Sequence, residues 1–154
     1  MKETIEKIIE HTAISEGFVE HVYKCPAGYD TIGYGRNIEA NPLSEDEKKM
    51  LENGKVSKEV AKEWLRSELE RCYKQLDSNF AWFKSLDTAR KGALCDMVYN
   101  LGFRGFCTFK NTIKAIEARN WNKVAQGLES SKWYRQVGVR SRKIVEIIKS
   151  GEIK

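Results

Sequence analysis

The stretch from Ser15 to Arg36 constrains the fold of this chain more than any other part of it. Two strand-like segments, Val22 to Lys24 and Thr31 to Tyr34, flank the turn sequence Gly28-Tyr29-Asp30. β-Branched and aromatic residues favour strands, whereas glycine and aspartate favour the turns between them. The stretch therefore predicts a small, strongly turned antiparallel sheet near the start of the chain.

Outside this stretch, apolar residues recur with the spacing of helices. Ile5, Ile8 and Ile9 predict an amphipathic N-terminal helix over residues 2–14, and Gly17 supplies the signal that ends it. Further helices are expected over residues 57–80, 88–101, 110–119, 120–128 and 140–149. Because the strands are confined to the first third of the chain, the expected fold class is α+β.

A short helix is also expected between the sheet and the long helix. Ser44 and Glu47 have the spacing of a capping box, in which each side chain accepts a hydrogen bond from the backbone of the other residue. Asn53-Gly54 is expected to close this helix.

The composition is that of a folded globular protein. Of the 154 residues, 41% are hydrophobic and 32% are charged, which allows a sizeable core and does not fit a disordered chain. The four cysteines show no metal-ligand spacing, and the charged N-terminus contains no apolar export signal, so reduced thiols and no metal or other cofactor are expected. The net charge of +5 favours a polyanionic partner.

Three segments of the sequence resemble the phage-type lysozymes, the endolysins that cleave bacterial peptidoglycan. Glu16, Cys25 and Thr31 fit that family's pattern of a Glu, eight residues, an Asp or Cys, five residues and a Thr. The other two segments are Met97-Val98-Tyr99-Asn100-Leu101-Gly102 and Trp133-Tyr134-Arg135-Gln136. The resemblance implies a single lysozyme-like domain. Its expected parts are a sheet lobe over about 17–56, an inter-lobe helix over about 57–80, and a helical lobe over about 81–154 together with the N-terminal helix.

The resemblance also implies the catalytic residues. Glu16 would be the acid that protonates the leaving oxygen, and Thr31 would hold the attacking water, which gives inverting hydrolysis. Cys25 stands where most of the family has an Asp. It could act as an anionic thiolate, favoured by the neighbouring Lys24, as a nucleophile, or simply as a space-filling residue.

Four further residues are expected to support the site by the same resemblance. Arg140 would orient Glu16, or would instead belong to a basic turn that faces phosphate groups. Asn37, Tyr99 and Thr112 would bind the sugars. Gly127 occupies another family position but has no side chain to contribute.

The implied partner is bacterial peptidoglycan, bound by a monomer that has no membrane anchor and does not bind nucleic acid. A phage-encoded chain of this kind would accumulate in the host cytoplasm and need a separate pore-forming protein to reach the wall. Two alternatives remain open: a lytic transglycosylase, in which a sugar hydroxyl replaces water, and a catalytically weak wall-binding protein. A nucleic-acid binder is disfavoured because the basic residues are scattered along every helix.

Overall fold

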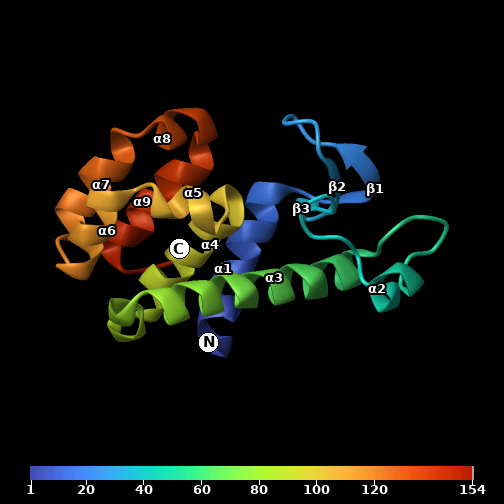
Figure 1. Cartoon of the computed structure of the whole chain (residues 1–154), viewed down its shortest axis with the longest axis horizontal. Helices are drawn as coiled ribbons and strands as arrows, with labels where there is room; N and C mark the ends of the chain where they lie inside the picture. Colours follow the sequence, from blue (N-terminus) through green and yellow to red (C-terminus); the bar gives the residue numbers. More distant parts are fainter. Residues whose placement is uncertain (154) are drawn as a thin grey trace. The chain divides into compact units, whose positions relative to one another are not determined.

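The computed structural model describes residues 1–153 and shows a largely helical chain with one small sheet (Figure 1). The elements follow in the order α1 (Lys2–Glu16), β1 (Val19–Lys24), β2 (Asp30–Gly33), β3 (Arg36–Asn37), α2 (Glu45–Lys49), α3 (Lys58–Asn79), η1 (Ala81–Ser85), α4 (Thr88–Leu101), α5 (Phe103–Cys107), α6 (Lys110–Glu117), α7 (Trp121–Glu129), α8 (Lys132–Val137) and α9 (Val139–Ser150). The predicted α+β class and the lysozyme-like fold are confirmed. Over the described residues, none of these helices combines the length and the apolar character needed to cross a membrane.

The chain divides into two compact units. Unit 2 runs from Ile9 to Glu68, and unit 1 combines Met1–Ile8 with the chain from Leu69 onward. The boundaries fall inside α1 and α3, so each of these helices contributes residues to both units. The finer division into lobes over 17–56, 57–80 and 81–154 stays a prediction.

Unit 2 contains the sheet. Its three strands are antiparallel in the order β1-β2-β3. Tyr23 pairs with Thr31, Lys24 pairs with Asp30, and the register shifts between Val19 and Tyr23. The sheet was predicted correctly, but β1 begins three residues earlier than the sequence indicated and β3 was not expected as a separate strand.

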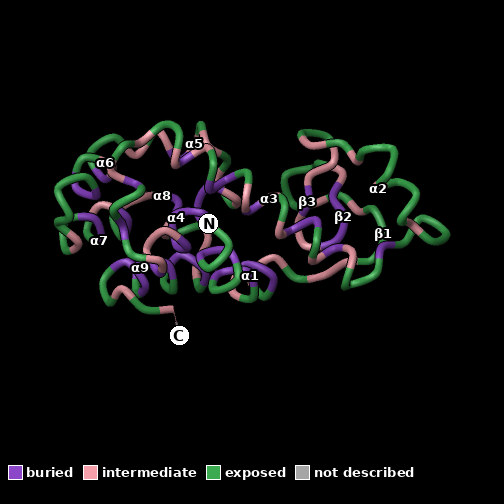
Figure 2. The backbone as a smooth tube through the Cα atoms, turned by 90° about the horizontal axis from the view of Figure 1, so that it is seen from below, coloured by how far each residue is buried: buried purple, intermediate pink, exposed green. Residues whose placement is uncertain are grey.

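The central strand anchors the sheet to a small apolar core. Ile32 is fully buried and packs with Val56, Ala61 and Trp64, and Figure 2 shows buried backbone along β2. Gly33 has a positive φ, and a Cβ at this position would lie 3.2 Å from the Cβ of Ala61. Glycine therefore meets two requirements here, because the backbone is left-handed and α3 approaches closely.

Arg36 fixes the loop that follows the sheet. Its guanidinium forms an ion pair with Glu47, donates to the backbone carbonyls of Asn41 and Pro42 at 3.2 and 3.0 Å, and lies 5.3 Å from the centre of the Trp64 ring. The side chain is only 7% exposed. Arg36 is thus a structural residue whose hydrogen bonds are directed inward.

The capping box is confirmed, but the predicted end of its helix is wrong. Ser44 and Glu47 cap each other's backbone, yet α2 ends at Lys49. Asn53 and Gly54 both have positive φ and connect Glu52 to Lys55, which exchange two backbone hydrogen bonds. Because Asn-Gly favours the two-residue hairpin turn, it forms a miniature hairpin here instead of closing a helix.

Unit 1 is helical and is built around α4. Asp87 caps this helix by accepting a hydrogen bond from the Arg90 backbone, and Gly102 ends it, in agreement with the helix expected over residues 88–101. Eight residues of α4 are buried, so the helix is apolar on nearly every side. The buried exception is Asp96, which forms a bidentate ion pair with Arg140 of α9 at 3.0 and 3.1 Å.

Candidate active site

The site begins with Glu16, the last residue of α1. Its side chain is half-buried, and its carboxylate lies against the backbone of Gly35. A Cβ at Gly35 would lie 2.5 Å from Oε2 and 2.7 Å from Cδ of Glu16. The second glycine of the motif therefore leaves the space that the carboxylate occupies.

Cys25 lies in a tight turn immediately after β1. Its backbone N–H donates to the Tyr29 carbonyl at 2.9 Å, and the Gly28 N–H donates to the Cys25 carbonyl at 2.8 Å. The pKa of the Cys25 thiol is lowered, chiefly because the backbone N–H of Tyr29 stabilises the thiolate. Partial burial opposes this effect, while the N–H groups of Ala27 and Gly28 and the hydroxyl of Thr31 add to it. The turn therefore favours an anionic sulfur.

Thr31 faces the same place from β2. Its side chain is buried, and its hydroxyl lies 2.9 Å from the Tyr29 carbonyl and also within hydrogen-bonding reach of the Cys25 sulfur. The hydroxyl has one proton and two lone pairs, so it can donate to one of these groups and still accept from another. Such a group is suited to orienting a water molecule.

Lys24 and Asp30 lie on the opposite side of the same strand pair. Their side chains form an ion pair at 2.8 Å. They lie on this face because successive residues of a strand point to opposite sides of the sheet. We expected Lys24 to be the group that favours the thiolate. Its charge does attract Cys25, but its ammonium is directed chiefly to Asp30, and the backbone of Tyr29 has the largest effect on the thiol.

Tyr23 was missed by the sequence reasoning. It pairs directly with Thr31 across the sheet, so the two side chains lie on one face. Burial raises the pKa of its phenol, and the negative charges of Glu16 and Cys25 raise it further. The phenol of Tyr23 therefore interacts electrostatically with both Glu16 and Cys25. Its position two residues before Cys25 in a strand-like segment was the signal that could have revealed it.

Asn37 follows Thr31 onto β3, where the two residues pair. Its side-chain carbonyl accepts hydrogen bonds from the backbone N–H groups of Glu39 and Ala40, both at 3.0 Å. Both lone pairs of this oxygen are thus engaged in the turn, so the amide hydrogens are what Asn37 can present to a sugar.

The other three predicted site residues belong to unit 1. Tyr99 is partly exposed near the end of α4. Thr112 is buried on α6, and a Cβ at Gly127 would lie 2.6 Å from its hydroxyl oxygen, so the absence of a side chain at 127 leaves room for Thr112. Arg140 forms the ion pair with Asp96 described above. Their roles at the catalytic residues stay predictions.

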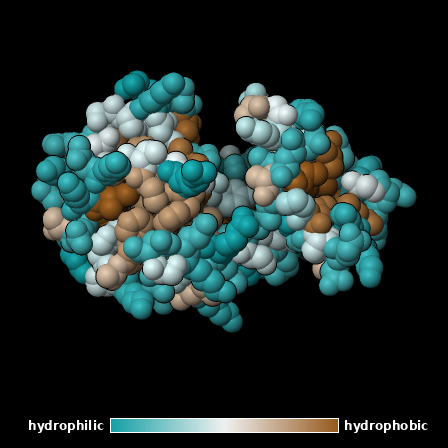
Figure 3. All heavy atoms as spheres, in the orientation of Figure 1, coloured by the Kyte–Doolittle hydropathy of each residue, from teal (hydrophilic) through white to brown (hydrophobic). Residues whose placement is uncertain are grey.

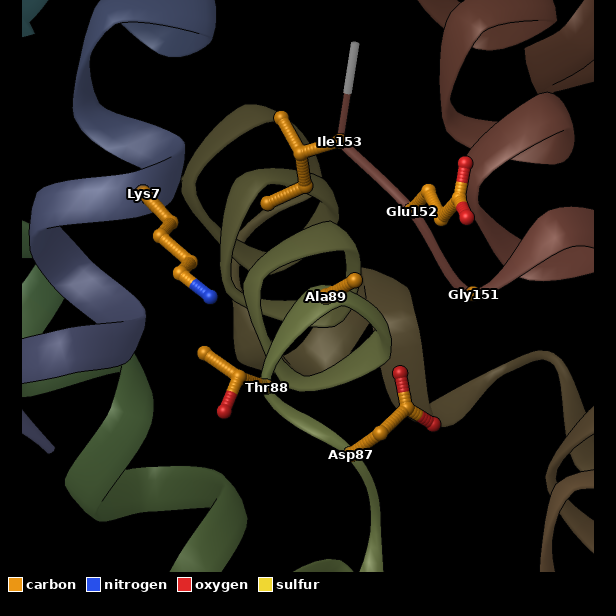
Figure 4. Close-up of a pocket in the computed structure, with 7 residues that line it drawn as sticks. All are labelled: Lys7, Asp87, Thr88, Ala89, Gly151, Glu152 and Ile153. Atoms are coloured by element: carbon orange, nitrogen blue, oxygen red, sulfur yellow. The ribbon is translucent and has the colours of Figure 1, made fainter.

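A cavity of about 550 Å³ is lined entirely by unit 1 residues: Lys7, Asp87, Thr88, Ala89, Gly151, Glu152 and Ile153 (Figure 4). Asp87 is engaged with Arg90 at 3.1 Å, and Lys7 forms an ion pair with Glu3 at 3.4 Å. Asp87 and Lys7 are thus each engaged in an ion pair within unit 1. Among residues 1–153, no three His, Cys, Asp or Glu side chains come together as metal ligands.

Unit 2 thus carries the carboxyl group of Glu16, the ionisable thiol of Cys25 and the hydroxyl of Thr31. A proton donor, an anionic group and a water-holding hydroxyl are the parts that glycosidic bond cleavage requires. Together with the lysozyme-like α+β fold, they define the class of lysozyme-type peptidoglycan hydrolases.

Comparison with known proteins identifies the family. The family model described as phage lysozyme matches residues 13–146, and the chain belongs to this family. A probable T4-type lysozyme 1 of Dictyostelium discoideum is 28% identical over 97% of both chains. A second, probable T4-type lysozyme 2 of the same organism, is 28% identical over 90% of this chain and 91% of its own length. The pre-baseplate central spike protein Gp5 of Enterobacteria phage T4 is 26% identical over 90% of this chain, which corresponds to 27% of that protein.

Proposed function

We propose that this protein hydrolyses the β-1,4 bond between N-acetylmuramic acid and N-acetylglucosamine in bacterial peptidoglycan, with inversion at the anomeric carbon. The observation that carries the proposal is the position of the Glu16 carboxyl group, held against Gly35 in the unit that also holds Cys25 and Thr31. Membership of the phage lysozyme family supports the same conclusion.

In the proposed reaction, protonated Glu16 gives its proton to the glycosidic oxygen as the bond to the anomeric carbon breaks. A water molecule oriented by Thr31 attacks that carbon from the opposite face, and its proton passes to the Cys25 thiolate. The products are a hydrated reducing end and a free hydroxyl on the departing sugar. Exchange with solvent then restores the protonated Glu16 and the ionised Cys25.

Cys25 fits the anionic role better than the role of nucleophile or filler. The backbone N–H of Tyr29 favours its ionised form, which a space-filling residue would not need. A negative sulfur also stabilises the positive charge that develops on the sugar ring. A covalent thioglycoside is unnecessary when Thr31 can supply oriented water.

The supporting residues complete the proposal. Tyr99 would stack on a sugar face, and Asn37 and Thr112 would contact sugar hydroxyls. Arg140, already paired with Asp96, would orient Glu16. These assignments draw substrate-binding groups from both units.

The test is product analysis with Glu16→Gln alongside the wild type. Peptidoglycan digested by the wild type should give muramyl ends that borohydride reduces, and the variant should lose at least about 100-fold of this activity. Asp30→Asn is the matched control, because Asp30 is a nearby carboxylate engaged by Lys24 on the other side of the strand pair.

Two outcomes would replace the proposal. Anhydromuramyl ends would identify a lytic transglycosylase, and no soluble products despite wall binding would identify a binding protein. Proton NMR of freshly formed products on a soluble fragment tests inversion, because the α-anomer must appear first. Initial formation of the β-anomer would show retention.

We further propose that the protein acts as a monomer and lyses bacteria by wall degradation. If it is phage-encoded, it would wait in the host cytoplasm for a separate pore-forming protein. Family membership by itself does not fix that setting, since two similar chains come from Dictyostelium discoideum. Lysis from within, on co-expression with a pore-forming protein but not without it, is the corresponding test.

A further inference from the structure

Tyr23 is a polar group on the catalytic face that the reaction described above does not use. Its partner across the sheet is Thr31, and directly opposed residues of antiparallel strands direct their side chains to the same face. The neighbouring pair, Lys24 and Asp30, forms its ion pair on the other face. The register thus places Tyr23 on the same face of the sheet as Thr31, the residue proposed to hold the water.

The electrostatic surroundings of the phenol are those of the reaction centre. Besides burial, the charges of Glu16 and Cys25 both oppose its ionisation. The hydroxyl therefore stays neutral wherever the proposed reaction can run, and it keeps a proton to donate. The ring is half-buried, which limits the positions that the hydroxyl can reach.

An uncharged hydrogen-bond donor at this position would complement the two acidic groups, Glu16 and Cys25, in binding a glycan. A glycan presents hydroxyl, ether and acetamido oxygens that accept hydrogen bonds, whereas Glu16 and Cys25 become acceptors once ionised. A lysine or arginine could donate as well, but its charge would oppose the positive charge that develops on the sugar. A phenol donates without that penalty.

We propose that Tyr23 is a further catalytic residue, which donates a hydrogen bond from its hydroxyl to the glycan beside the bond that is cleaved. This assignment rests on the proposed function, because it assumes that Glu16 and Cys25 flank the scissile bond. It adds a residue of β1 to the three proposed catalytic residues, which lie at the end of α1, in the turn after β1, and on β2.

The experiment compares Tyr23→Phe with the wild type on soluble, uncrosslinked peptidoglycan strands. Loss of one hydrogen bond to substrate should lower kcat/KM about tenfold. In the Glu16→Gln background, calorimetry should show affinity for the same strands weakened about fivefold by Tyr23→Phe. Tyr73→Phe is the matched control, because it removes a hydroxyl that lies 3.4 Å from Lys91 in unit 1.

Two measurements separate contact with the substrate from an indirect effect. If Tyr23 touches the glycan, the pH midpoints of activity and the pH dependence of Cys25 alkylation should match those of the wild type. A shift in either would show that Tyr23 acts through Cys25 or Glu16, and would overturn the proposed contact. Unchanged kcat/KM and affinity, or an equal loss in Tyr73→Phe, would overturn it as well.

The failure of this inference can be distinguished from failure of the proposed function. If Glu16→Gln is inactive while Tyr23→Phe behaves as the wild type, only the role of Tyr23 is wrong. If Glu16→Gln keeps its activity, the proposed acid is wrong, and the change in kcat/KM caused by Tyr23→Phe, compared with that of Tyr73→Phe, still decides whether the Tyr23 hydroxyl contributes to the reaction.

Discussion

The two units of this protein carry opposite net charges. Unit 1 contains 19 Lys and Arg against 10 Asp and Glu, a net charge of +9, whereas unit 2 contains 8 against 12, a net charge of −4. Hydrophilic side chains line the edges of the visible face, and hydrophobic ones gather in patches between them (Figure 3). The overall charge of +5 is therefore the sum of a strongly positive unit 1 and a negative unit 2.

This difference suits the chemistry proposed for unit 2. Negative charge in this unit would stabilise positive charge that develops on a sugar, but it opposes the ionisation of a thiol. Cys25 can ionise there because backbone N–H groups, which carry no net charge, favour its thiolate. Unit 1, by contrast, offers the cations that would attract an anionic cell wall.

The units also differ in how they hold a buried charge. Asp96→Asn in unit 1 should lower the free energy of unfolding by about 3 kcal/mol, because it removes the carboxylate that forms a bidentate ion pair with the buried Arg140. Urea denaturation would measure the loss, and Asp77→Asn, on the same unit's α3, serves as the control. If Asp96→Asn lowered the free energy of unfolding by less than Glu47→Gln does in unit 2, the Asp96–Arg140 ion pair would not be the more stabilising of the two.

Gly35 in unit 2 and Gly127 in unit 1 each leave space for the side chain of a proposed site residue. Gly35→Ala should lower kcat about 100-fold, because its Cβ would displace the Glu16 carboxyl group from its place. Gly127→Ala would crowd Thr112 instead and should mainly raise KM, if Thr112 binds sugar. Steady-state kinetics on soluble strands separates the two effects. Normal kcat in Gly35→Ala would show that the carboxyl group does not need this position.

The cysteines of the two units should respond differently. Cys25→Ser should lower activity about 30-fold, because a serine hydroxyl does not ionise near neutral pH. Activity of the wild type should rise with pH as Cys25 ionises, and Cys25→Asp should move this rise to lower pH, since an Asp ionises near pH 4. A pH–rate profile is the measurement. Cys107→Ser in unit 1 should leave the profile unchanged, and an unshifted profile in Cys25→Asp would exclude the anionic role.

Acid should weaken unit 2 through Glu47. The hydrogen bond from Arg36 lowers the pKa of Glu47 in the folded protein, so this pairing stabilises fully above the unfolded pKa near 4.3. Its contribution is lost as the pH falls through the lowered folded value. Glu47→Gln should cost about 1 kcal/mol at pH 7, because Arg36 keeps its carbonyl acceptors, and should cost nothing at low pH. Equal costs at both pH values would contradict this linkage.

The smallest expected effect concerns surface charge. Lys114→Glu with Lys143→Glu, both exposed in unit 1, should weaken binding to isolated cell walls about threefold at low salt. The matched pair Lys48→Glu and Lys49→Glu in unit 2 removes the same charge and should have less effect. Co-sedimentation at about 0.05 and 0.5 M salt would test both pairs. Equal losses would show that only net charge matters.

Local signals predicted the fold well where they were strong. Long apolar periodicity located α1, α3 and α4, and the side chain of Ser44 marked the start of α2 correctly. The short helices η1, α5 and α8 were not predicted, because five or six residues hold too little periodicity to be recognised. Asn53-Gly54 was misread because the same dipeptide can follow a helix or close a hairpin.

The sequence by itself determined the fold class and the spacing of Glu16, Cys25 and Thr31, because both are properties of local order along the chain. Only the tertiary structure decided that Gly35 makes room for the Glu16 carboxyl group, and that backbone N–H groups rather than Lys24 chiefly favour the Cys25 thiolate. It also placed Tyr23 opposite Thr31, on the same face of the sheet. These relations depend on strand register and on the direction of backbone N–H groups. Both are properties of the folded backbone and cannot be inferred from the identity of the residues alone.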